Sequence, residues 1–180
     1  MVLKRYPFFL VLLFVGMIVL GMPRFSSADE LERGNAAFVQ GDYPEAYKIW
    51  LVDAENGIAN AQVALGSLYA YGRGVPQSDA EAVKWFRRAA DQGSPDGLYA
   101  LAMAVYAGKG VERDLVLSVQ LMEKAAQGGN SFAQLMLSAF YEQGVGVEVN
   151  AEKAKYWKDH YTAQSASLEG QILDRVQNGN

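Results

Sequence analysis

The apolar residues of this chain recur at a helical spacing, which predicts pairs of helices. Within residues 60–71 the apolar side chains stand at i, i+4, i+7 and i+8 on one helix face: Ala61, Leu65, Leu68 and Tyr69. A second helix is expected to begin after Ser78, because a serine side chain can accept a hydrogen bond from a free N–H of the first turn. The pattern therefore predicts a helix-turn-helix unit.

The same unit recurs with a period of 36 residues. Glycine, any residue, glycine and valine stand together at residues 72–75, 108–111 and 144–147. A column of helix-capping residues keeps the same period: Ser78, Asp114 and Asn150. Glycine accepts the positive φ that a sharp helix end requires, so each glycine loop is expected to end the first helix of its unit. Self-similarity at this period predicts a solenoid.

The expected fold is all-α, a right-handed α-solenoid of helix-turn-helix repeats. Full units are expected at residues 59–94, 95–130 and 131–164, after a variant first repeat at 29–58 that lacks the longer glycine loop. Residues 165–180 are expected to form a capping helix or tail, because apolar residues stand there at i, i+4 and i+8: Leu168, Ile172 and Val176. We expect this helix to cover the exposed end of the stack, since the terminal units of solenoids differ from the others.

Residues 1–28 have the three parts of a secretory signal peptide. Lys4 and Arg5 precede an apolar stretch at residues 8–22, and small residues follow up to Ala28. The apolar stretch is shorter than the roughly 20 residues that span a bilayer, which favours cleavage. An uncleaved anchor stays open as the alternative. We therefore expect a periplasmic or secreted protein, or else one anchored in an inner membrane.

Charge and cysteine content narrow the function classes. The chain has 16 basic and 20 acidic residues, and loss of residues 1–28 would remove Lys4, Arg5 and Arg24, leaving a net charge of −7. Such a balance does not fit the basic stripe of a nucleic-acid binder. The chain has no cysteine, which excludes disulfides and a lipid attached to cysteine. Packing alone must hold the fold.

The first full unit carries the spaced motif of a known repeat family. It reads Ala61-x-x-x-Leu65-Gly66-x-x-Tyr69-x-x-Gly72-x-Gly74-Val75, followed by Ala82, Trp85, Ala89-Ala90 and Gly93. This motif resembles the Sel-1-like repeat, a tetratricopeptide variant with a longer internal loop, and the resemblance covers residues 30–161. It implies an adaptor that holds an assembly together or regulates a partner. Exported bacterial members are linked to envelope signalling, polysaccharide export and host interaction. A cysteine-rich exported subgroup is connected with β-lactams, but this chain lacks its paired cysteines.

We find no enzyme motif in the chain. Its single histidine, His160, has no companions at the spacing of a metal site or of a nucleophilic triad. The glycine loops do not have the spacing of a phosphate loop and do not follow a strand. We therefore expect no catalysis, no cofactor and no metal.

The candidate partner-binding residues lie opposite the core positions of the first helices. The resemblance implies that first helices line the concave side of the solenoid, so these residues should share one face: Val63, Ser67, Tyr99, Met103, Tyr106, Leu135 and Glu142. Tyr99, Met103 and Tyr106 are large and apolar, as interface anchors are. The alternative is that they pack on a neighbouring helix.

The function expected from these observations is a non-catalytic adaptor of the bacterial envelope. It would bind a protein or peptide on the concave face and regulate a signalling or assembly process. A second hypothesis is an envelope enzyme or glycan-binding protein that acts on peptidoglycan or β-lactams. A third is a scaffold held in the membrane by residues 8–22.

Overall fold

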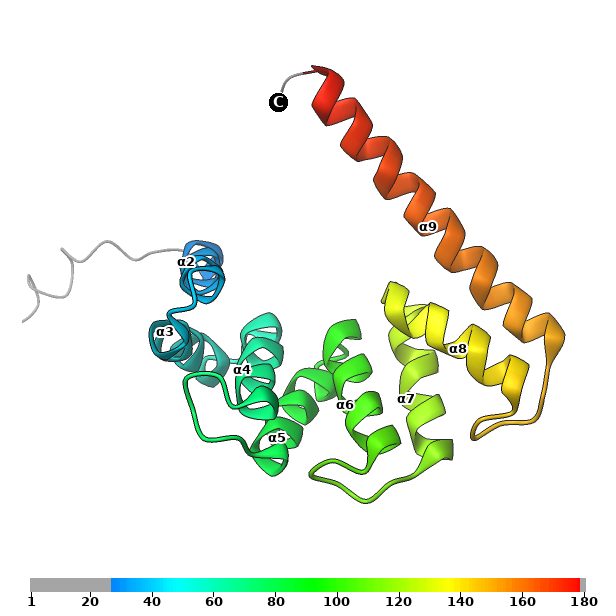
Figure 1. The fold of residues 1–180 in the computed structure, drawn as a ribbon, viewed down its shortest axis with the longest axis horizontal. Coiled ribbons are helices and arrows are strands. Elements are labelled where there is room, and N and C mark those ends of the chain that lie inside the picture. The colour runs from blue at the N-terminus through cyan, green and yellow to red at the C-terminus, as the bar shows by residue number, and fades with distance from the viewer. Residues whose placement is uncertain (1–26, 179–180) are drawn as a thin grey trace, which may run out of the picture.

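The computed structural model describes residues 27–178, and every regular element within them is a helix (Figure 1). The helices are α2 (Ser27–Val39), α3 (Tyr43–Glu55), α4 (Ala59–Tyr71), α5 (Asp79–Asp91), α6 (Pro95–Ala107), α7 (Leu115–Gln127), α8 (Ser131–Gln143) and α9 (Ala151–Asn178). Residues 1–26 of the predicted signal segment lie outside the described part. The predicted all-α solenoid is confirmed.

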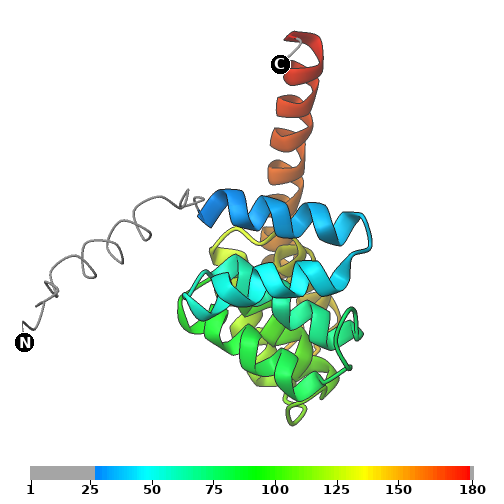
Figure 2. The ribbon, with the colours of Figure 1, turned by 90° about the vertical axis from the view of Figure 1, so that its left-hand side faces the viewer.

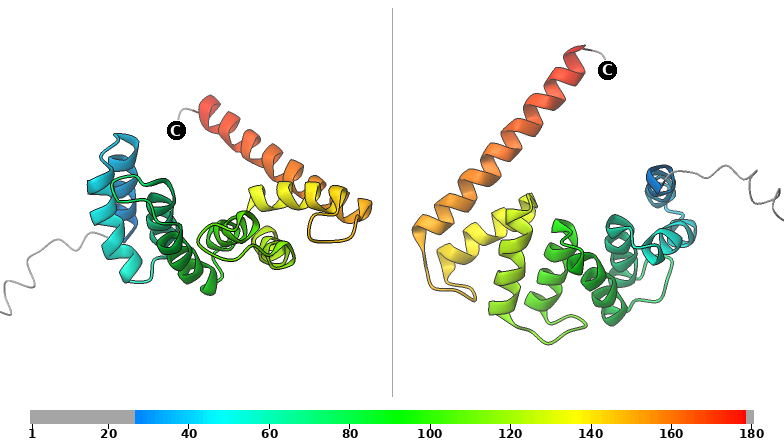
Figure 3. Two further views of the ribbon diagram at one scale, coloured as in Figure 1. Left: turned by 60° about the horizontal axis from the view of Figure 1, so that its bottom comes forward. Right: turned by 180° about the vertical axis from the view of Figure 1, so that it is seen from behind.

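The helices follow one another along an arc (Figures 1 and 3). Each helix packs on the next one in the chain, and α4 also contacts α6. Contact between the first helices of successive units is what a curved stack requires on its inner side. The arc opens toward the side on which α2 and the far end of α9 lie (Figures 1 and 2).

Capping residues set the starts of the second helices, as predicted. Ser78 Oγ accepts a hydrogen bond from the N–H three residues further on, at 3.3 Å. Asp114 and Asn150 accept the equivalent bond, each at 2.9 Å. These bonds satisfy one of the free N–H groups that every helix start exposes. The first helices end one residue before a left-handed glycine: Gly72, Gly108 and Gly144, with φ of 64°, 67° and 73°.

The second glycine of each loop has a different role, because it lets the loop contact the backbone of the preceding unit. A Cβ built on Gly110 would lie 2.2 Å from the backbone oxygen of Asp79, the first residue of α5. A Cβ on Gly146 would lie 2.4 Å from the oxygen of Leu115, the first residue of α7. Each glycine loop therefore packs on the second helix of the preceding unit, which joins successive units.

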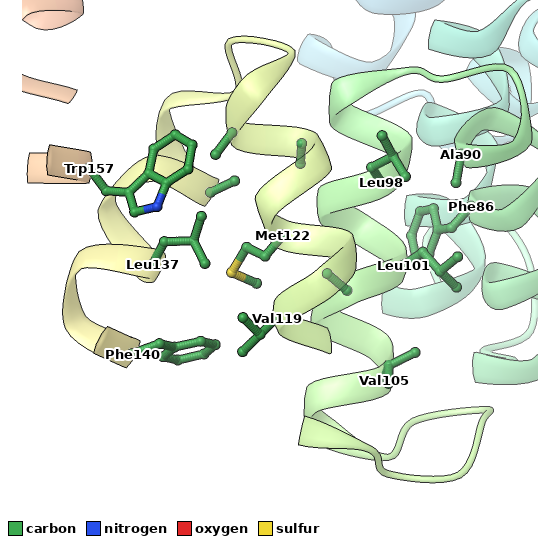
Figure 4. Packing of buried hydrophobic residues seen from close by; sticks show 14 of the residues in the cluster. Phe86, Ala90, Leu98, Leu101, Val105, Val119, Met122, Leu137, Phe140 and Trp157 are labelled. Atoms are coloured by element: carbon green, nitrogen blue, oxygen red, sulfur yellow. The ribbon is translucent and has the colours of Figure 1, made fainter. Parts of the chain in front are cut away.

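The core follows the predicted columns (Figure 4). The leucine column is buried, with exposed fractions of 0%, 6% and 0% at Leu65, Leu101 and Leu137. Ser118 is also buried and its Oγ donates to the Ala102 oxygen at 2.9 Å. The partners of Ser118 in its column are alanines, so short side chains at this position let adjacent helices approach closely.

The C-terminal segment differs from the expected cap. Helix α9 is continuous through residue 164, and its far end extends away from the stack (Figures 1 and 2). The residues expected to cover the end of the stack are exposed: Leu168 by 51%, Ile172 by 60% and Val176 by 75%. The reason lies at Ser165, which takes the place of a positive-φ glycine in the column of Gly93 and Gly129. Without that glycine the helix does not turn back.

Candidate binding groove

One groove of about 490 Å³ lies between α4 and α6. Helix α5 forms its floor and the start of α8 closes one edge. We call it the α4–α6 groove, and it is lined by Val63, Ser67, Ala70, Tyr71, Asp79, Ala82, Val83, Phe86, Asp96, Tyr99, Ala100, Met103, Ala104, Ala107, Lys109, Asn130 and Phe132. Pockets of this size, mainly apolar with a few polar groups, are typical ligand sites.

Small residues leave the groove open. Alanines of α4 and α6 line it at positions where the core pattern places no large side chain. On the floor, Phe86 comes so close to α4 that a Cβ on Gly66 would lie 2.5 Å from its ring. Phe86 is only 7% exposed, so it supports the groove from below.

Two exposed aromatic side chains stand over the edges of the groove. Tyr71, at the end of α4, is 72% exposed, and Phe132, in the first turn of α8, is 63% exposed. The ring of Phe132 stacks on that of Tyr99, with centroids 6.0 Å apart. Exposed aromatic groups beside an apolar hollow are characteristic of interaction sites, because they gain most when a partner removes them from water.

The charged groups of the groove stand near helix ends. Asp79 and Asp96 lie in the first turns of α5 and α6, and Lys109 lies in the loop after α6. The ion pairs recorded among residues 27–178 involve none of these three groups. Asp96 accepts a hydrogen bond from Asn130 Nδ2 at 2.7 Å. The groove thus offers a partner two carboxylates and one ammonium group.

Burial raises the pKa of Tyr99, and the nearby Tyr71 adds to this effect. Like other tyrosine hydroxyls, that of Tyr99 is protonated at neutral pH and can donate a hydrogen bond, and the raised pKa extends this to more alkaline solution. With Ser67, Tyr99 adds a hydroxyl group to the otherwise apolar wall of the groove. The Ser67 hydroxyl donates to the Val63 oxygen at 2.9 Å and keeps acceptor capacity for a ligand.

The structure brings four of the predicted binding residues into the α4–α6 groove: Val63, Ser67, Tyr99 and Met103. Tyr106 does not line it. Its ring stacks on that of Phe140 at 5.3 Å between centroids, which is the packing role that was the alternative for this column. Leu135 and Glu142 are exposed on α8 outside the groove lining. Whether any of these residues binds a partner stays a prediction.

The sequence analysis did not predict five residues of the groove lining as binding residues: Tyr71, Asp79, Asp96, Lys109 and Phe132. Phe132 had a readable signal, since the equivalent residues one and two periods earlier are Asp96 and Asn60. A lone aromatic residue in a polar column does not belong to the core pattern of the repeat. Tyr71 had a similar signal, because it stands two positions after the core residue Tyr69 and so leaves the core face.

Residues 27–178 show neither a cluster of metal-ligating side chains nor a helix suited to cross a membrane. No group of three or more histidine, cysteine, aspartate or glutamate side chains is placed to hold a metal ion. No helix in this range combines the length and the apolar character that a membrane crossing requires.

Among known proteins, the chain resembles exopolysaccharide production negative regulators of Rhizobium. It is 34% identical to that of Rhizobium meliloti over 138 residues, which cover 69% of this chain and 52% of the relative. It is 32% identical to that of Rhizobium leguminosarum over 143 residues, which cover 72% of this chain and 54% of the relative. The chain therefore spans about half the length of these relatives.

Two solved structures share the fold. A Sel1 repeat protein from Oxalobacter formigenes has a TM-score of 0.71 and 28% identity, and the match covers 82% of this chain and 62% of that one. A protective antigen of uropathogenic Escherichia coli strains with an SLR fold has a TM-score of 0.69 and 33% identity, over 77% of this chain and 30% of that one.

The family model of the Sel1 repeat matches this chain at residues 59–94, 95–130 and 131–157. These matches contain all three glycine loops and the helices that form the α4–α6 groove. Proteins built from such repeats are protein-interaction scaffolds. With three consecutive repeats over more than half its length, the chain belongs to the Sel1 repeat family.

Proposed function

We propose that this protein is a non-catalytic adaptor that binds a protein or peptide partner in the α4–α6 groove. The observation that carries the proposal is the pair of exposed aromatic residues, Tyr71 and Phe132, over an apolar hollow. A partner would insert apolar side chains between α4 and α6 and stack on these rings. Displacement of water from such a centre supplies most of the affinity of a protein interface.

The partner segment is expected to carry a positive charge beside its apolar residues. Asp79 and Asp96 outnumber Lys109 in the groove, and the described ion pairs leave these groups to solvent or to Asn130. Complementary charge at an interface rim accelerates association and selects among partners. Phosphorylated or strongly acidic segments are expected to bind poorly.

We place this adaptor in the bacterial envelope, with a regulatory role. Residues 1–28 support export, since they have the parts of a signal peptide. The similarity to proteins named as negative regulators of exopolysaccharide production supports regulation as the process. Because the chain spans about half of those relatives, this role is a proposal for the chain and not a property transferred from them.

The test compares a groove variant with a matched surface variant. Tyr71→Ala with Phe132→Ala removes the exposed rings without touching the core, and partner binding should fall at least about tenfold because aromatic anchors dominate interfaces. Val116→Ala with Leu117→Ala, on α7, removes side chains that are 56% and 41% exposed and should leave binding unchanged. Equal binding by the two variants in co-purification from the native envelope would exclude the groove as the site.

A further inference from the structure

The C-terminal arm, residues 165–178 of α9, carries an apolar row that nothing in the described chain covers. Leu168, Ile172 and Val176 are more than half exposed and stand at successive turns of one helix face. Leu173, beside them, is 58% exposed. A solvated helix normally shows polar residues all round, so a row of this kind indicates a helix that docks in an apolar groove.

The same chain offers such a groove. Helices α4 and α6 have 13 residues each, and the arm has 14, so both are about 20 Å long at 1.5 Å per residue. The groove is apolar along its middle and exposes Tyr71 and Phe132 at its edges. Arm and groove therefore match in length and in apolar character.

Charges on the arm also complement those of the groove. Arg175 flanks the apolar row on one side and Glu169 flanks it on the other. The groove carries Asp96 at the start of α6 and Lys109 just after its end. An arm that lies antiparallel to α6 places Arg175 nearer the Asp96 end of the groove and Glu169 nearer its Lys109 end, so the two charges follow the same order along arm and groove. Asp174 stands on the side of the arm away from the apolar row.

The arm of one molecule does not reach its own groove while α9 stays whole. The first half of α9 is fixed to α8 through Ala154 and Trp157, which are buried. From there the continuous helix leads the arm away from the stack (Figures 1 and 2). A second copy of the chain is free of this restriction, because its arm approaches from outside.

We propose that the C-terminal arm of one molecule docks in the α4–α6 groove of a second copy. If each molecule gives its arm to the other, the two contacts close into a symmetric dimer. This inference shares the groove with the proposed function but does not require a foreign partner. If the protein also binds a foreign partner in this groove, the arm of the other copy competes with that partner. Self-association then regulates access to the groove.

The first test is the oligomeric state of the protein purified after expression with its own N-terminal segment. Sedimentation equilibrium up to about 100 µM covers complexes of micromolar Kd. We expect the wild type to dimerise. Leu168→Glu with Ile172→Glu should raise the dimer Kd at least about tenfold, because charge replaces two apolar anchors. The matched control, Ser167→Glu with Gln171→Glu, adds the same charges at the same spacing on the other side of the arm and should leave the dimer intact.

The second test mixes two variants. Tyr71→Glu with Phe132→Glu spoils the groove and leaves the arm intact, and the arm variant does the reverse. Each variant alone should be monomeric, whereas an equimolar mixture should form a heterodimer, since one intact arm then meets one intact groove. A monomeric wild type, a groove variant that still dimerises or a mixture without heterodimer would each overturn the proposal. If the dimer formed through contact between two arms, the groove variant would still dimerise.

Failure of this inference and failure of the proposed function have different signatures. If the protein is monomeric but its partner is lost from the groove variant, self-association is wrong and the function stands. If the dimer behaves as described but partner binding ignores the groove variant, the function is wrong and self-association stands.

Discussion

Gly110→Ala should destabilise the protein by more than the conformation of the glycine alone explains. Gly110 has a φ of 69°, and an added Cβ would lie 2.2 Å from the backbone oxygen of Asp79. An alanine with a left-handed backbone costs about 1–2 kcal/mol. Here the loop must also move off the start of α5, and overpacking of this kind costs about 1–3 kcal/mol more.

Gly93→Ala is the matched control for this substitution. Gly93 has a similar φ of 78°, but nothing lies within 4 Å of an added Cβ. Both substitutions remove the same flexibility from the unfolded chain, so this contribution cancels between them. The difference between the two variants therefore isolates the contact between units, and we expect it to be about 1–3 kcal/mol.

Urea denaturation followed by circular dichroism measures this difference. In thermal unfolding, Gly110→Ala should melt about 2–12 °C below Gly93→Ala, since 1 kcal/mol corresponds to about 2–4 °C for a domain of this size. Because each solenoid unit contacts only its neighbours, amide exchange should accelerate first around α5 and α6. Equal stability of the two variants would show that the second glycine is a turn residue only and that the loops do not join the units.

The packing of single side chains, and its absence in the C-terminal arm, can be tested at three further places. Tyr106→Ala should lower the free energy of unfolding in urea by about 1–3 kcal/mol, because it removes a stacked, half-buried ring. Tyr71→Ala, at an exposed position, should lower it by less than about 0.5 kcal/mol. Similar losses for the two variants would contradict the packing role of Tyr106. The hydrogen bond with Tyr47 (3.1 Å) and partial burial raise the pKa of Tyr69 to about 12. Because this pKa is raised, the hydrogen bond contributes fully to stability below about pH 10, and the contribution is lost as the pH rises toward 12. Tyr47→Phe should lower that pKa in an NMR titration of ring-labelled tyrosine, and an unchanged pKa would show that the bond is absent. In dilute protein, amides of residues 165–178 should exchange much faster than those of the part of α9 that packs on α8, because no buried side chain holds the arm; uniform protection along α9 would show that something covers it.

Much of the fold could be predicted because each repeat contains residues that mark the ends of its helices. The capping column and the first glycine of each loop act within a few residues of the helix ends that they define, so sequence alone locates those ends. The first helix expected at residues 60–71 is found as Ala59–Tyr71. The contact of Gly110 with Asp79 could not be predicted in this way, because it depends on how two units approach each other.

The direction of the C-terminal helix depends on the residue at position 165. The glycine column ends at Gly129 and continues as Ser165, which removes the turn. The helical spacing of the apolar residues that follow predicted a helix correctly. It could not show where that helix points, since an apolar row is equally compatible with a cap on its own stack and with a free arm.

The candidate site was predicted in part, for a geometric reason. Columns at a fixed period identify side chains on the same side of each first helix, and Tyr99 and Met103 do lie in the groove with residues of α4. The columns do not show where on that side a hollow forms. It forms over Phe86, and Tyr106 turns instead to a ring of the next unit.

Site-specific photo-crosslinking in the native envelope tests the binding groove most directly. A photoreactive phenylalanine analogue in place of Phe132, which is 63% exposed at the groove edge, should crosslink a distinct partner protein. The same analogue in place of Val116, which is 56% exposed on α7 outside the groove, should not. A partner crosslinked equally from both positions, or from Val116 alone, would contradict the assignment of the α4–α6 groove as the binding site.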